Sequence, residues 1–140
     1  MKKLLTNFMM LTLIMTLFLT GCKTGAPSVP ETATNVPVES AVLGEGSTQF
    51  DFTVTDKDGN ETQFEIHTDK ETVGEALTEL GLISGEEGAY GLYVKTVNGI
   101  TADYDKDGVY WAFYENGEYA TAGIDSTAVT EGAVYSMRIE

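Results

Sequence analysis

Residues 49–68 read QFDFTVTDKDGNETQFEIHT, and this stretch decides the fold. Apolar and polar residues alternate on both sides of a polar centre, which is typical of two strands that each bury one face. Asp58-Gly59 lies in the centre, and this dipeptide is typical of a tight hairpin turn. The stretch therefore predicts an antiparallel hairpin with strands at 49–55 and 62–68. The side chains expected to point inward are Phe50, Phe52, Val54, Phe64 and Ile66.

The next segment predicts one short helix. Thr72-Val73-Gly74-Glu75 fits a capping box, in which the Thr72 hydroxyl accepts a hydrogen bond from the Glu75 amide and Glu75 reaches back. Gly81 suits a left-handed helix end. Because so short a helix is unstable alone, we expect it to pack on the sheet. Its apolar stripe consists of Val73, Ala76, Leu77 and Leu80.

Further strands are expected after the helix. They cover 92–97, 109–114 and 133–139, where apolar side chains recur at every second position. Residues 84–89 are expected to form a loop, and Asn116-Gly117 a tight turn. The order β-β-α-β-β-β predicts an α+β domain over 47–140. A β-grasp, ubiquitin-like sheet with one packed helix fits this order best.

The first 46 residues have a different composition. An uncharged apolar run from Leu4 to Leu19 follows Lys2-Lys3, which is the layout of an export signal. The run closes on Leu-Thr-Gly-Cys22, which resembles the processing site of bacterial lipoproteins. We expect a signal peptide at 1–21 and, at 22–46, a lipidated N-terminus followed by a disordered tether. A plain signal peptide with a chance cysteine and an uncleaved membrane helix are the alternatives.

These features predict where the protein works. Lipid chains on Cys22, palmitate among them, would anchor the chain to the extracytoplasmic face of the cell membrane. Cys22 is the only cysteine, so no disulfide within the chain is expected. Removal of 1–21 leaves six basic and 22 acidic residues, a formal charge of −16. Such a chain is not expected to bind nucleic acid. Its negative charge is expected to keep it soluble, and the alternative is that the charge attracts a cationic partner.

Four segments, taken in order, resemble a known family. They are TVGEAL at 72–77, YVKTVNGI at 93–100, YWAFYENG at 110–117 and AGID at 122–125. Together they resemble the transcobalamin-like C-terminal domain, the small β-domain of the vitamin B12 carriers, over about Phe50 to Glu140. In those carriers the domain closes over cobalamin against a larger helical domain. The resemblance implies a corrinoid ligand, with lower affinity or with a second protein or second copy completing the site.

Aromatic residues are the candidates for ligand contact. Seven tyrosines in so small a domain exceed the needs of a core, and each has a flat face with a polar tip. By resemblance, the segment from Tyr119 to Ala122 approaches the ligand. The alternatives are an ordinary tyrosine-bearing sheet face and, for Trp111, a place in the core. The predicted ligand-binding residues are Tyr90, Tyr93, Trp111, Tyr114, Tyr119, Ala120 and Thr121, with Tyr110 a further tyrosine of the same group.

Signals for metals and catalysis are weak. Asp103, Asp105 and Asp107 before Gly108 resemble the front of a calcium loop, but Tyr114 stands where such a loop needs an acid. A turn with solvated acids is the favoured interpretation. The single histidine, His67, is expected on the polar side of its strand. No nucleophile and base recur at a catalytic spacing, so we expect no enzyme and no required cofactor.

The leading hypothesis is a membrane-anchored binding lipoprotein that captures cobalamin or a related corrinoid for uptake by a membrane transporter. Its rival is a cell-surface module for protein–protein interaction or adhesion, which would use a free sheet edge and have no small-molecule ligand.

Overall fold

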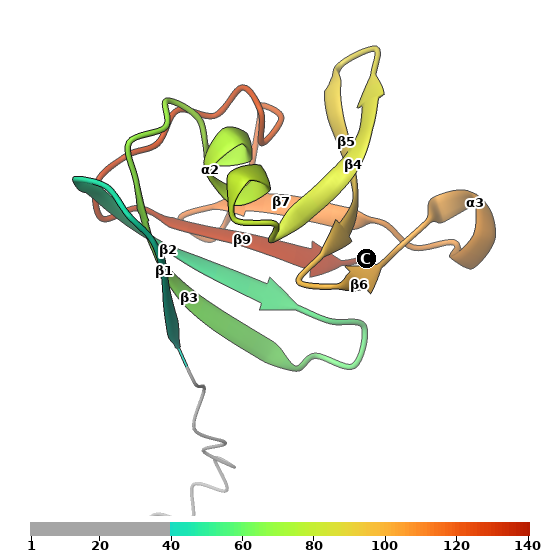
Figure 1. Cartoon of the computed structure of the whole chain (residues 1–140). Helices are drawn as coiled ribbons and strands as arrows, with labels where there is room; N and C mark the ends of the chain where they lie inside the picture. The colour runs from blue at the N-terminus through green and yellow to red at the C-terminus, as the bar shows by residue number, and fades with distance from the viewer. Residues whose placement is uncertain (1–39) are drawn as a thin grey trace, which may run out of the picture. The chain divides into compact units, whose positions relative to one another are not determined.

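The computed structural model describes residues 40–140, which form two sheets and two short helices. Figure 1 shows one helix lying over the larger sheet. The domain is mostly β-sheet with two short helices, which agrees with the predicted α+β class. The predictions for Cys22, the signal peptide and most of the tether lie outside the described residues. Within 40–140, no helix is long and apolar enough to cross a membrane.

The larger sheet has six strands in the order β1-β3-β2-β9-β7-β8. They are β1 (Ala41–Gly44), β2 (Thr48–Thr55), β3 (Glu61–Thr68), β7 (Trp111–Glu115), β8 (Glu118–Tyr119) and β9 (Val134–Ile139). The central pair β2·β9 is parallel, as is β1·β3, and the other pairs are antiparallel. Strands from the two ends of the domain therefore lie side by side in its middle.

The smaller sheet is a meander of three strands in the order β4-β5-β6. They are β4 (Ile83–Gly88), β5 (Gly91–Val97) and β6 (Ile100–Thr101). The hairpin of β4 and β5 extends away from the larger sheet (Figure 1). The two helices are α2 (Val73–Glu79) and the single turn α3 (Tyr104–Asp107).

The predicted β2–β3 hairpin is confirmed. Phe52 lies opposite Phe64 in an antiparallel register, and the inward side chains of both strands are buried. Asp56 closes the turn, because its Oδ1 accepts hydrogen bonds from the backbone N–H groups of Asp58 (2.8 Å) and Asn60 (2.9 Å). Gly59 takes the left-handed conformation there (φ 83°), which a glycine adopts without strain.

The predicted helix is also confirmed. The Thr72 hydroxyl accepts a hydrogen bond from the Glu75 N–H (3.3 Å), and Gly81 ends the helix with φ 70°. Leu82 then folds back, with its N–H donating to the Leu77 carbonyl (2.9 Å). Val73, Ala76 and Leu77 are buried against the sheet, so the apolar stripe is the face that attaches the helix.

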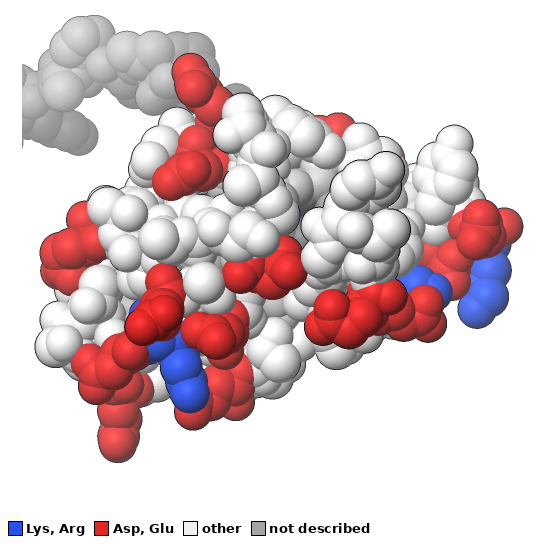
Figure 2. Space-filling model, turned by 90° about the horizontal axis from the view of Figure 1, so that it is seen from above, with Lys and Arg blue, Asp and Glu red and all other residues white. Residues whose placement is uncertain are grey.

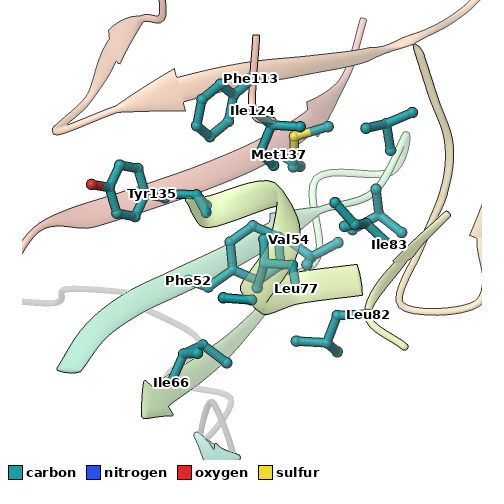
Figure 3. Close-up of a cluster of buried hydrophobic side chains, with 14 of the residues drawn as sticks. Phe52, Val54, Ile66, Leu77, Leu82, Ile83, Phe113, Ile124, Tyr135 and Met137 are labelled. Carbon is teal, nitrogen blue, oxygen red and sulfur yellow. The ribbon is translucent and has the colours of Figure 1, made fainter. Parts of the chain in front are cut away.

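The core lies between α2 and the inner face of the larger sheet (Figure 3). Tyr135 is fully buried at its centre, with the Phe50 ring edge-on at 5.2 Å and the Phe113 ring stacked at 6.0 Å. Burying each such side chain contributes roughly 1.5–3 kcal/mol to folding. The Tyr135 hydroxyl still donates a hydrogen bond to the Ala128 carbonyl (3.0 Å), so its one polar atom is satisfied.

Two segments differ from the sequence expectations. Residues 84–89 were expected as a loop, but 83–88 form strand β4, whose exposed Ser-Gly-Glu-Glu-Gly run carries no apolar alternation. Ala41–Gly44, assigned to the tether, forms edge strand β1 in parallel register with β3. Both strands are specified by backbone pairing with a neighbour and not by a buried face, so a hydrophobic pattern does not indicate them.

Candidate functional site

A hollow of about 250 Å³ opens between β5 and the chain that follows β8. We call it the aromatic pocket. One wall comes from β5 and the other from the segment after β8, while β7 and β9 close the bottom. Its lining residues are Leu92, Tyr93, Val94, Tyr110, Trp111, Phe113, Tyr119, Ala120, Ala122, Gly123, Ile124 and Met137.

The bottom of the aromatic pocket is apolar and continuous with the core. Figure 3 shows Phe113, Ile124 and Met137 beside one another, and all three are buried. Trp111 is only 6% exposed, yet its indole Nε1 is buried without a hydrogen-bond partner among the described residues. An unpaired buried donor costs about 1–3 kcal/mol, so this N–H lowers the stability of the fold where it lies.

The rim of the aromatic pocket carries tyrosines with their rings accessible. Tyr93 is 41% and Tyr119 58% exposed. The Tyr93 ring lies 5.9 Å from the ammonium group of Lys95, which is held by Glu86 at 3.0 Å. The bond to Glu86 raises the pKa of Lys95, although partial burial opposes the shift. Tyr93 is therefore flanked by a fixed cation on the β5 side.

A second group of phenols borders the pocket at β7 and β8. Tyr114 lies edge-on to Tyr119 at 5.4 Å, and the Arg138 guanidinium sits 4.6 Å over the Tyr114 ring. Tyr114 donates its hydroxyl hydrogen to Glu140, and this bond raises the pKa of Tyr114. The neighbouring Tyr119 and burial, followed by Glu140, raise the pKa of Tyr110. Both phenols are therefore neutral donors at pH 7.

Similarity to known proteins indicates the family of this chain. Residues 70–134 match a family described as a domain of unknown function (DUF4430). A crystallised protein of Ruminococcus gnavus, described as a candidate metal-binding protein, is 33% identical over 67% of this chain and 97% of its own, with a TM-score of 0.63. The chain belongs to this family of transcobalamin-like small domains.

A more distant structure shares the fold of this transcobalamin-like domain. Haptocorrin in complex with Cbi is 20% identical, with a TM-score of 0.50 over 70% of this chain and 26% of haptocorrin. No curated protein matches the chain.

The structure brings some of the predicted ligand residues together and separates others. Tyr93, Trp111, Tyr119 and Ala120 line the aromatic pocket of this transcobalamin-like domain. Tyr90 lies at the tip of the β4–β5 hairpin and is fully exposed, so it does not line the pocket. Tyr114 and Thr121 are also absent from the lining. The Tyr114 side chain instead contacts Arg138 and Glu140.

Sequence reasoning missed the apolar part of the lining. The strand pattern predicted all of these side chains except Ile124 as core, and all of them serve the core and the pocket at once. They are Leu92, Val94, Phe113, Ile124 and Met137. Gly123 lies in the AGID segment that carries the family resemblance, so that segment was the signal that pointed to this wall.

The three aspartates of the calcium-like stretch form no common site in the structure. Asp103 caps α3 by accepting from the Asp105 N–H (3.1 Å), and its Oδ2 lies 3.7 Å from Lys95 and 3.6 Å from Lys106. Burial would raise the pKa of Asp103, but the N–H of Asp105 and the two lysines outweigh it and lower the pKa. Over residues 40–140, no three His, Cys, Asp or Glu side chains gather in a way that could hold a metal ion.

Two other polar features lie away from the aromatic pocket. His67 is half-buried, and its Nε2 lies 2.8 Å from Glu65 Oε1, so the histidine is paired and not simply exposed. A second hollow, of about 230 Å³, lies over the outward side of β2 and β3 and includes Asp51 and Glu65. These acids occupy opposite register positions, which is unfavourable for like charges and indicates no ligand by itself.

Proposed function

We propose that this chain is a binding protein, not an enzyme, and that its aromatic pocket takes the edge of a planar amphipathic molecule, with a corrinoid such as cobalamin the first expected ligand. The observation that carries the proposal is the aromatic pocket itself, an apolar hollow with Trp111 in its lining and the exposed tyrosines Tyr93 and Tyr119 at its rim. Such a site combines a large apolar contact with one polar group that orients the ligand.

The size of the aromatic pocket limits how the ligand is held. Its volume of about 250 Å³ is below the roughly 300–1,000 Å³ of sites that enclose a drug-sized molecule. Only an edge of a corrin ring would enter, with Tyr93 and Tyr119 against its faces and Trp111 in contact with the edge. A second protein or second copy would have to cover the remainder of the ligand.

The charge of the domain favours neutral or cationic ligands. Figure 2 shows many Asp and Glu side chains, and few Lys or Arg, on the face that it presents. The full sequence carries a formal charge of −14, so anions approach against an unfavourable potential.

The likeness to haptocorrin supports the proposal, because haptocorrin shares this fold and its structure is that of a complex with Cbi. The order of the strands, with the parallel pair β2·β9 at the centre, supports a β-grasp class for the sheet.

The proposed location follows from the N-terminal sequence. Lipid on Cys22 would hold the domain near the extracytoplasmic face of a membrane, on a tether that includes Pro27, Pro30 and Pro37. Captured ligand would then be close to a membrane transporter. Metabolic labelling of expressing bacteria with a radioactive fatty acid tests the anchor, because wild-type protein should be labelled and Cys22→Ala protein should not.

Calorimetry tests the ligand directly. The chain from residue 22 with Cys22→Ser, which carries no lipid, is titrated with dicyanocobinamide and with cyanocobalamin. Binding should give heat, shift the corrinoid absorption bands and raise the melting temperature in proportion to the logarithm of ligand excess. No heat and no spectral change at high micromolar concentrations would count decisively against a corrinoid.

A free sheet edge supports the second candidate function. Among the described residues, β4 has no strand on its outer side, and Glu86 and Glu87 lie along it. An extended, basic segment of another protein could add a strand there. A stable protein partner whose binding is abolished by a proline at Glu86, together with no response to corrinoids, would favour this function over ligand capture.

A further inference from the structure

Three glycines lie close against Asp125: Gly91 and Gly123 against its carboxylate and Gly74 against its backbone. A Cβ on Gly91 would lie 2.5 Å from Asp125 Oδ2, and a Cβ on Gly123 would lie 2.7 Å from Oδ1. A Cβ on Gly74, in α2, would lie 2.7 Å from the Asp125 Cα. Contacts this short do not occur for real Cβ atoms, so these positions lack side chains because Asp125 fills their space.

The Asp125 carboxylate joins the two walls of the aromatic pocket. Its Oδ2 accepts a hydrogen bond from the Leu92 N–H (3.2 Å), in the β5 wall. Its Oδ1 is buried with no hydrogen-bond partner within residues 40–140 and lies under Gly123, in the opposite wall. One side chain therefore touches the backbone of both walls and fixes how closely they approach.

The Gly123 wall is fixed to the helix as well. The Gly74 N–H donates to the Ile124 carbonyl (2.8 Å), and the Val73 N–H donates to the Thr127 carbonyl (2.9 Å). Thr127 in turn donates its hydroxyl hydrogen to the Gly123 carbonyl (2.9 Å). With this wall held by α2, the hydrogen bond between Leu92 and Asp125 links the β5 wall to it directly.

We propose that Asp125 is a positioning residue that sets the width of the aromatic pocket by holding the β5 wall against the helix-bound wall. The effect on affinity rests on the proposed ligand-binding function, whereas the effect on geometry does not. Asp125 acts through Leu92 and Gly123, which line the pocket, and does not line the pocket itself.

A double-mutant cycle between Asp125 and Gly123 tests this geometry. Gly123→Ala alone drives a methyl group into Oδ1, whereas after Asp125→Ala the next nearest neighbour of that methyl is the Tyr90 carbonyl, at 3.8 Å. Each single variant should displace the walls, and the double variant should be less perturbed than Gly123→Ala alone. Trp111, the only tryptophan, reports on the pocket through its fluorescence emission and its single indole N–H resonance in NMR spectra.

The ligand measurement uses dicyanocobinamide and the lipid-free chain. Asp125→Ala and Gly123→Ala should each weaken binding about fivefold or more, as expected when a buried contact is lost. Asp125→Asn keeps an oxygen that can accept the hydrogen bond from the Leu92 N–H, so its affinity should stay within about twofold of the wild-type value. This conservative variant also covers the case in which Asp125→Ala folds poorly.

Asp69→Ala is the matched control. Asp69 also accepts a backbone hydrogen bond across the sequence, from the Ser47 N–H (2.9 Å), but it lies outside the aromatic pocket. It should lower the melting temperature without changing Trp111 emission or cobinamide affinity.

The outcomes separate the two proposals. If wild type does not bind dicyanocobinamide but the Trp111 signals still show coupling between Asp125 and Gly123, the corrinoid proposal fails and the positioning role stands. If the Trp111 signals of Asp125→Ala match those of Asp69→Ala, or the two perturbations simply add, the positioning role is overturned.

Discussion

The two antiparallel hairpins of this domain, β2–β3 and β4–β5, share a backbone pattern and differ in what they bury. Every inward side chain of β2 is at most 2% exposed, whereas in β4 only Ile83 is buried. The first hairpin builds the core under α2, and the second extends from it and supplies a wall of the aromatic pocket. The wall comes from β5, whose Val94 belongs to the core as well, while most of β4 stays outside the core.

The largest expected difference between the hairpins is in stability. Phe52→Ala should lower the free energy of unfolding by about 3–5 kcal/mol, because a fully buried ring leaves a cavity between α2 and the sheet. Tyr93→Ala, on β5, should cost less than half as much, since Tyr93 is 41% exposed and its loss leaves no enclosed cavity. Urea unfolding followed by circular dichroism gives both values, and equal losses would contradict the division between the hairpins.

Ligand binding should depend on the aromatic pocket and not on the β2–β3 hairpin. Trp111→Phe keeps an aromatic ring but shortens a side chain that lines the pocket and removes its indole N–H, so affinity for dicyanocobinamide should fall about fivefold to tenfold. Phe64→Leu, in the β2–β3 hairpin, is the control, because it perturbs the core without touching the lining of the aromatic pocket. Undiminished affinity in Trp111→Phe, measured by calorimetry, would show that the indole N–H makes no contact with the ligand.

The same contrast explains what the sequence could predict. Alternation of Phe50, Phe52 and Val54 specifies a strand because burial requires it, and the capping residues around α2 are local signals. The β4 strand has neither, and β1 depends on pairing with β3 alone. For the pocket, tyrosines were a visible signal, whereas the buried Ile124 and Met137 were indistinguishable from core residues.

The contacts of Asp125 lay beyond sequence reasoning altogether. Leu92 and Asp125 are 33 positions apart, and Gly74 is further away still. No pattern of period two or 3.6 connects them, because the link is one residue whose carboxylate fills the space at Gly91 and Gly123 and whose backbone fills the space at Gly74. Only the placement of three separate elements around it shows the relationship.

A smaller effect is expected in the pH dependence of the first hairpin. The hydrogen bonds from Ser47 N–H and its hydroxyl hold the pKa of Asp69 below its usual range. A lowered folded-state pKa adds stability that is fully present above the unfolded pKa of about 3.9 and is lost as pH falls through the folded pKa. Asp69→Asn should therefore be less stable than wild type at pH 7, and this difference should shrink below about pH 4. Melting temperatures across that range test this, and a difference that stays constant with pH would refute it.

The smallest effect is expected at the tip of the second hairpin. Tyr90 is fully exposed and does not line the aromatic pocket, so Tyr90→Ser should change the free energy of unfolding by less than about 0.5 kcal/mol. Cobinamide affinity should also stay the same, because a corrin edge held between Tyr93 and Tyr119 does not need the tip. An exposed tyrosine at the end of a hairpin is, however, well suited to close over a ligand that protrudes from a shallow pocket. A loss of affinity of more than about threefold in Tyr90→Ser, with unchanged stability, would show that the hairpin bends toward the ligand, and that the second hairpin differs from the first in mobility as well as in burial.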